Sequence, residues 1–235
     1  MNRPSRCYIL TLAVIFFGVV IASGVAPWHR NDWLLENALV ALGVFALVVI
    51  YRKLPLSRVS WTCLFLFLCL HELGAHYTYS EVPYDAWCER LTGRSLSNLL
   101  DWERNHFDRG VHFLYGLWLS YPVREIFLSL AKVRGFWSYF FPLDVTISTS
   151  ALYEVVEWAA AEVFSGDLGQ AYVGAQGDVW DAQKDMALAA LGAVITMTAA
   201  AVVNWRCQRD FAREWAESFR VDPSAAKNAE TQAPR

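Results

Sequence analysis

Six long apolar segments constrain the fold of this chain more than any other feature of its sequence. About 20 apolar residues in an α-helix cross a hydrocarbon core roughly 30 Å thick, and lipid-exposed irregular backbone is not stable there. Of the 235 residues, 55% are hydrophobic, which is more than one soluble domain normally hides. The sequence therefore predicts an all-α membrane helix bundle of about six transmembrane helices, near residues 8–25, 34–51, 59–79, 109–128, 138–164 and 186–205.

These segments predict one transmembrane domain over residues 1–220. The fifth segment is the least uniformly apolar, since it contains Pro142, Asp144, Glu154 and Glu157, and we expect it to be bent or to end in a water-filled cavity. Residues 221–235 are rich in Ala, Pro, Lys and Glu and have no apolar period. That composition predicts a disordered tail.

The basic residues of the connections indicate the orientation, because Lys and Arg are retained on the cytoplasmic side during insertion. Of the 20 basic residues, 14 fall on the side that holds both termini. This predicts a multi-pass membrane protein with both termini and the tail in the cytoplasm. The basic residues form no cluster typical of nucleic-acid binding, so we expect membrane lipids and no nucleic acid as partners. The sequence indicates no protein partner.

In this orientation, acidic and histidine residues from four segments fall on the outer side of the membrane. An ionisable side chain in the membrane costs a few kcal/mol and needs a partner, a cavity or a metal. Imidazoles and carboxylates bind zinc and other divalent metals, and a carboxylate is also a general base. The candidate catalytic residues are Glu154, Glu157, Asp108 and His112, and the candidate metal ligands are His71, His76, His112, Asp178, Asp181 and Asp185.

Two pairs of these residues are spaced to share a helix face. Asp108 and His112 are four residues apart, so a structural carboxylate–imidazole pair and a direct catalytic role are both open. Glu154 and Glu157 are one turn apart in an apolar helix, where two acids repel unless a cation, a histidine or a shared proton lies between them. The second pair therefore favours a functional role.

Other acidic and histidine residues have structural alternatives. Asp178 and Asp181 precede the last apolar segment and could cap that helix. His76 could belong to an aromatic belt at the membrane interface. Glu72 and Glu125 lie near predicted helix ends, where we expect pairing with arginines of the loops.

Four motifs, in this order, resemble those of the YjdF-like bacterial inner-membrane proteins. They are His-Glu-Leu-Gly-Ala-His-Tyr-Thr-Tyr at 71–79, Asp-Arg-Gly-Val-His-Phe at 108–113, Tyr-Glu-Val-Val-Glu-Trp at 153–158 and Gly-Asp-Val-Trp-Asp-Ala-Gln-Lys-Asp-Met at 177–186. The resemblance covers roughly residues 30–205. It implies the fold and the membrane location, and it implies no reaction because the activity of that family is unassigned.

A looser pattern is similar to that of VanZ-like membrane proteins. These have an Asp and a His four residues apart at the start of one helix, a Glu in the next helix, and an Asp-rich turn before another. The matching positions here are Asp108, His112, Glu154 or Glu157, and Asp181 or Asp185. The element at 71–79 is additional, so this similarity implies the shape of a site and no substrate.

The residues leave three functions open. The first is a membrane enzyme whose outward-facing acidic and histidine site acts, with or without a divalent metal, on a lipid or another envelope molecule. The second is a proton- or cation-coupled transporter, and the third is a structural or accessory membrane protein. Charged groups at one membrane edge favour an enzyme or a binding protein over a transporter.

Overall fold

A computed structural model describes residues 4–54, 56–164 and 175–207 of the chain. In these ranges the regular structure is entirely helical, and they contain no β-strand. The predicted all-α class is therefore confirmed. The predicted tail at 221–235 lies outside the described residues.

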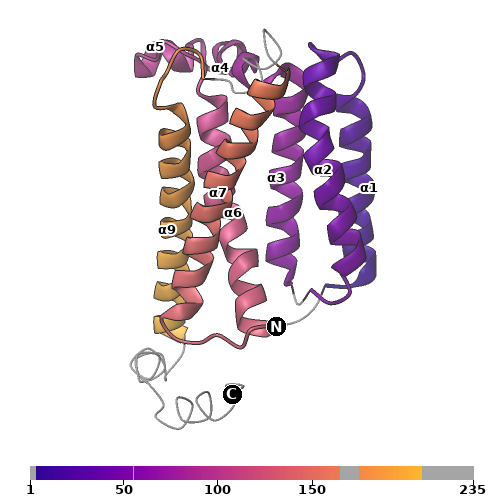
Figure 1. Cartoon of the computed structure of the whole chain (residues 1–235), viewed down its shortest axis with the longest axis vertical. Coiled ribbons are helices and arrows are strands. Elements are labelled where there is room, and N and C mark those ends of the chain that lie inside the picture. The colour runs from indigo at the N-terminus through magenta and orange to yellow at the C-terminus, as the bar shows by residue number, and fades with distance from the viewer. Residues whose placement is uncertain (1–3, 55, 165–174, 208–235) are drawn as a thin grey trace, which may run out of the picture.

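Six long helices of the described ranges lie side by side as a bundle (Figure 1). A helix lies at each of the six predicted ranges. α1 begins and α9 ends at the same end of the bundle, and we call the opposite end the site end (Figure 1). The helices are α1 (Arg6–Ser23), α2 (Arg30–Ile50), α3 (Arg58–Tyr77), α6 (Phe107–Ser129), α7 (Trp137–Phe164) and α9 (Asp181–Cys207).

Four helices in the described ranges are both long enough and apolar enough to cross a membrane, by length and composition: α1, α2, α3 and α9. α6 has 23 residues and α7 has 28, which is also enough to span a hydrocarbon core. α7 carries four acidic side chains and α6 carries charged side chains near both of its ends, which lowers their mean hydropathy. The number of six crossings and the cytoplasmic position of the termini stay predictions.

The long polar connection between α3 and α6 contains short helices. They are the 3-10 helix η1 (Tyr79–Glu81), α4 (Tyr84–Thr92) and α5 (Leu96–Leu100). Ser95 caps α5, and Asp85 ties α4 to α5 by accepting hydrogen bonds from the Ser95 hydroxyl at 3.1 Å and the Ser97 amide at 2.8 Å. α4 and α5 lie across the site end of the bundle (Figure 1).

α6 and α9 approach each other at backbone distance near the middle of the bundle. A Cβ atom added to Gly116 of α6 would lie 1.9 Å from the carbonyl oxygen of Ala189 in α9. A Cβ added to Gly192 of α9 would lie 2.2 Å from the carbonyl oxygen of Phe113 in α6. Small residues of this kind allow close helix packing in membranes, where van der Waals contact drives helix association. The two glycines therefore fix the distance between the two helices.

We expect Gly116→Ala to destabilise the protein by about 1–3 kcal/mol, because its methyl group would collide with backbone atoms that no rotamer change can move. Thermal unfolding of the purified protein in one detergent, followed by circular dichroism, measures the effect. Gly18→Ala is the matched control, since a Cβ at Gly18 meets no atom within 4 Å. Equal melting temperatures for the two variants would contradict the role of Gly116.

Candidate functional site

Asp108 and His112 form the centre of the site, at the beginning of α6. They are one turn apart, so both side chains lie on the same face of the helix. Asp108 Oδ1 is 3.7 Å from His112 Nε2, and both residues are buried. Asp108 lies in the first turn of α6, where the helix dipole favours a negative charge. The pair predicted from spacing is therefore formed.

α7 and α9 each add a carboxylate to this pair. Glu154 Oε1 of α7 is 3.6 Å from His112 Nε2. Asp185 of α9 is 2% exposed, and its carboxylate, that of Asp108 and a ring nitrogen of His112 all lie within 4.8 Å of one another. Glu157, one turn beyond Glu154, is also buried. We call Asp108, His112, Glu154 and Asp185 the acid–histidine cluster.

The cluster has unused ligand atoms. Oδ1 of Asp185 and Oε1 of Glu154 are buried and have no hydrogen-bond partner in the described part of the chain. A buried carboxylate oxygen without a donor is costly, so a proton or a cation is needed to compensate for its charge. One imidazole and two carboxylates are a common ligand set for a divalent transition metal. The geometry of Asp108, His112 and Asp185 fits such an ion.

Asp178 and Asp181 take part in ion pairs next to the cluster. Arg104 Nη1 donates to Asp181 Oδ1 at 2.5 Å, and Arg109 Nη2 donates to Asp178 Oδ2 at 2.5 Å and to Asp181 Oδ1 at 3.1 Å. Lys184 Nζ also contacts Asp178 Oδ2 at 2.5 Å. These cations already neutralise the two carboxylates, so the geometry supports Asp178 and Asp181 as an anchor for the start of α9. Their role as metal ligands stays a prediction.

The two histidines of α3 have different surroundings. His71 is buried near the cluster, and its Nδ1 lies 2.5 Å from the hydroxyl of Tyr79. Its Nε2 has no hydrogen-bond partner among the residues that the structure describes. His76 Nδ1 instead contacts the carbonyl oxygen of Ser23 at 2.8 Å, and its ring packs edge-on against Tyr77. The geometry thus places His71, and not His76, beside the cluster.

Two acidic residues of α2 also belong to the polar region, although the sequence did not predict them as site residues. Asp32 and Glu36 are each 7% exposed, and Asp32 Oδ2 accepts a hydrogen bond from Thr78 at 3.2 Å. Glu36 lies near enough to Asp108 for their charges to interact. The signal in the sequence is a pair of acids four residues apart at the beginning of an apolar run, which puts both on one helix face.

The expected pairing of Glu72 and Glu125 with loop arginines is wrong. Glu72 is fully buried and accepts a hydrogen bond from the Ser23 hydroxyl of α1. Glu125 accepts from the backbone amide of Ser57 and from the hydroxyl of Ser60, both at 2.7 Å. Serine donors near neighbouring helix ends bind one oxygen of each carboxylate, whereas Oε1 of each has no hydrogen-bond partner in the described part of the chain.

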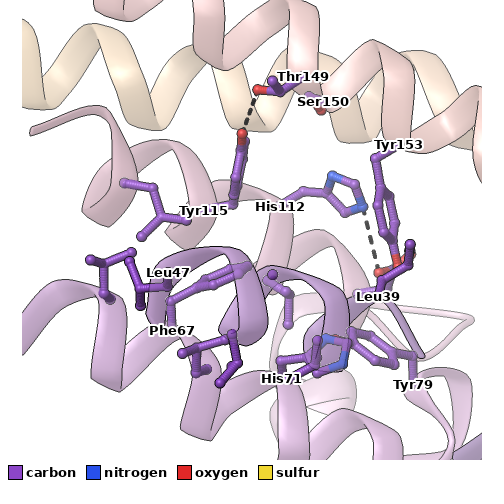
Figure 2. Close-up of a pocket in the computed structure, with 18 residues that line it drawn as sticks. Leu39, Leu47, Phe67, His71, Tyr79, His112, Tyr115, Thr149, Ser150 and Tyr153 are labelled. Carbon is purple, nitrogen blue, oxygen red and sulfur yellow. Dashed lines mark hydrogen bonds and ion pairs between the residues drawn. The ribbon is translucent and has the colours of Figure 1, made fainter. Parts of the chain in front are cut away.

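A groove of about 390 Å³ extends from the cluster along α2, α3, α6 and α7. At its polar end lie His71 and Tyr79 on one side and His112 and Tyr153 on the other (Figure 2). The rest of its lining is mainly aliphatic and aromatic. Farther along, the hydroxyl of Tyr115 lies 2.5 Å from Thr149 Oγ1 (Figure 2). The site therefore combines a polar, acidic end with an apolar channel.

Comparison with known proteins identifies the family. The family described as predicted membrane protein (DUF2238) matches residues 8–206. The chain belongs to the DUF2238 family. This DUF2238 protein is also 33% identical over 213 residues to the inner membrane protein YjdF of Escherichia coli (strain K12), an alignment that covers 90% of this chain and 98% of the relative.

The family match confirms the YjdF-like resemblance, and with it a location in the inner membrane, where the protein contacts lipids. The resemblance to VanZ-like proteins is not shown by these comparisons and stays a prediction. No solved structure matches this DUF2238 protein. Its site must therefore be interpreted from its own geometry.

We expect the ion pairs of Asp178 to make the site end sensitive to acid. Hydrogen bonds from Lys184, from the Trp180 amide and from Arg109 hold the pKa of Asp178 well below its ordinary value of 3.8. A lowered pKa stabilises the fold above the pKa of the unfolded state, and this stabilisation is lost as the pH falls through the folded pKa. Asp178→Asn should therefore lower the melting temperature at pH 7, by an amount that shrinks as the pH falls below about 4.

Thermal unfolding of wild type and Asp178→Asn across this pH range measures the difference. Asp101→Asn is the matched control, since Asp101 is exposed and Asn tolerates its left-handed backbone, with φ at 55°. A difference between wild type and Asp178→Asn that is the same at every pH would contradict the ionic role.

Proposed function

We propose that this protein is a membrane-embedded enzyme that binds a divalent metal at Asp108, His112 and Asp185 and acts on a lipid or a lipid-linked envelope molecule. The observation that carries this proposal is the position of these three ligand groups, which lie within 4.8 Å of one another and are all buried. They come from two helices that pack at backbone distance, so their mutual geometry is rigid. A preorganised set of this kind is what a catalytic metal needs.

The charge balance of the site supports a cation. Arg104, Arg109 and Lys184 pair with Asp178 and Asp181, whereas the deeper acids have no arginine or lysine among the contacts found in the described ranges. Several carboxylates that share one buried region cannot all ionise without compensation. A divalent cation would compensate two of them at once.

Each residue of the cluster then has a chemical role. A bound divalent metal would lower the pKa of a coordinated water or polarise a carbonyl or phosphoryl group of the substrate. Glu154 Oε1 lies 3.6 Å from His112 Nε2 and accepts no hydrogen bond in the described ranges, so it lies where a general base could take a proton from that water. Glu157 is buried one turn from Glu154 on the same helix, where the two carboxyl groups can share a proton. The pair can therefore store and deliver a proton.

One observation favours a transporter as the second candidate. Glu125, near the opposite end of α6 from Asp108, is 1% exposed, and its Oε1 has no hydrogen-bond partner in the described ranges. Ser120 of α6 is also buried with an unpaired hydroxyl in those ranges. Polar groups along one helix are what a proton or cation path requires. Uptake of protons or cations into proteoliposomes that depends on both Glu154 and Glu125 would favour this function over the enzyme.

The metal content of the purified protein tests this proposal directly. We expect purified wild type, supplied with divalent metals and kept free of chelators, to retain close to one metal ion per chain by mass spectrometry. Asp185→Asn removes one ligand and should weaken metal affinity at least about ten-fold, because even groups outside the ligand set affect affinity by this much. Asp101→Asn, the exposed control, should keep the metal.

Glu154→Gln separates metal binding from chemistry. If Glu154 is a base and not a ligand, this variant should keep its metal and lose the envelope phenotype that wild type rescues in a deletion strain. Folding of each variant is checked by its melting temperature. The hypothesis of a metal-dependent enzyme would be ruled out if the wild type held no metal, or if the Asp185→Asn variant kept both the metal and the phenotype.

A further inference from the structure

The groove beside the cluster is lined mainly by apolar side chains. Its apolar lining comes from four helices and includes Leu39, Val44, Leu47, Leu64, Phe67 and Leu119. The outer surfaces next to it are also apolar, since Leu42 and Phe45 of α2 are 65% and 68% exposed and Leu152 of α7 is 63% exposed. In a membrane protein such surfaces face lipid. The groove is therefore flanked by lipid-facing surface on α2 and on α7.

The length of the groove matches one leaflet of the bilayer. Its lining extends along α6 from Asp108 to Leu119, which is about 16 Å at the rise of an α-helix. Half of the hydrocarbon core is roughly 15 Å. A chain that lies in the groove would thus extend from the level of the acid–histidine cluster to about the middle of the membrane.

The volume of the groove decides what kind of occupant fits. The groove offers about 390 Å³, near the lower limit of small-molecule sites. An apolar cavity of this size suits a small or slender ligand such as one hydrocarbon chain.

Unpaired polar atoms in the groove wall add a second observation. Nε2 of His71 and the hydroxyl of Ser150 both belong to residues that line the groove, both are buried, and both lack a hydrogen-bond partner in the part of the chain that the structure describes. Buried polar atoms of this kind are normally paired. A ligand with a polar group at the end of an apolar chain would supply the partner for His71.

We propose that the groove binds one long hydrocarbon chain of a membrane lipid, with the polar end of that chain at His71, Asp108 and His112. This gives the substrate class of the proposed enzyme and rests on the proposed function for the reaction, although binding itself does not require the metal. Acyl and prenyl chains share the necessary chemistry. The chain enters sideways from the membrane between α2 and α7, so the lipid need not leave the bilayer.

Gly43 offers a way to block the groove without disturbing the fold. It lies in the lining on α2, and a Cβ at this position meets no atom within 4 Å. Gly43→Leu should therefore place an aliphatic side chain in the groove. Gly18→Leu on α1 is the matched control, because Gly18 also has open space around it and does not line the groove.

The experiment uses full-length protein in vesicles of phosphatidylethanolamine and phosphatidylglycerol, with a small fraction of phosphatidylethanolamine that carries a diazirine on one acyl chain. After illumination, mass spectrometry locates the crosslinks. We expect crosslinks at Phe67 and Leu119 in the groove, reduced at least five-fold in Gly43→Leu and unchanged in Gly18→Leu, while crosslinks at exposed Phe45 stay constant. Competition by a free fatty acid or by a free prenyl alcohol identifies the preferred chain.

Crosslinks restricted to exposed side chains, or equal groove crosslinks in Gly43→Leu and wild type, would overturn the proposal. The crosslinking result is independent of the measurement of metal content. Gly43→Leu should keep the metal of the wild type, and Asp185→Asn should lose the metal and still give the groove crosslinks. If only the crosslinks fail, the site acts on another substrate, and if only the metal fails, the lipid groove remains.

Discussion

The backbone contact between α6 and α9 is the interaction on which the site depends. Asp108, His112 and Gly116 are spaced by four residues along α6, so the face that packs against α9 also carries the first two site residues. Asp185 lies one turn before Ala189, which contacts Gly116. Contact at the glycine therefore brings three ligand groups together. A larger residue at Gly116 would push α9 away from α6 and so separate Asp185 from Asp108 and His112.

Electrostatics divides the polar region into two parts with different properties. In the part closer to the loops, Arg104 and Arg109 bind Asp178 and Asp181, so charges are paired and the start of α9 is held in place. In the deeper part, Asp185 keeps an unpaired buried oxygen within the described residues. The paired part can stabilise the fold, whereas the unpaired part costs stability unless a proton or cation binds. Such a cost is common where a site serves binding or catalysis.

Local patterns in the sequence were sufficient to predict the features that depend on a single helix. Apolar runs predicted where the long helices lie, and spacing by four predicted the contact between Asp108 and His112. Contacts between distant segments were not predictable in this way. Asp181 is bound by Arg104 from the connection before α6 and by Arg109 from α6, and the serine partners of Glu125 come from the start of α3. Helix periodicity contains no information on either.

The groove and the cluster together restrict the chemistry more than each does alone. Acidic ligands by themselves fit a metal enzyme, a proton carrier or a structural network. An apolar groove that ends at Asp108 and His112, as deep as about one leaflet, favours a ligand that stays in the bilayer while its polar end reaches the acids. The apolar walls offer few polar partners along the rest of the groove, so the acid–histidine end is where chemistry is possible. A reaction there would act on the bond next to the chain, at the interface between lipid and water.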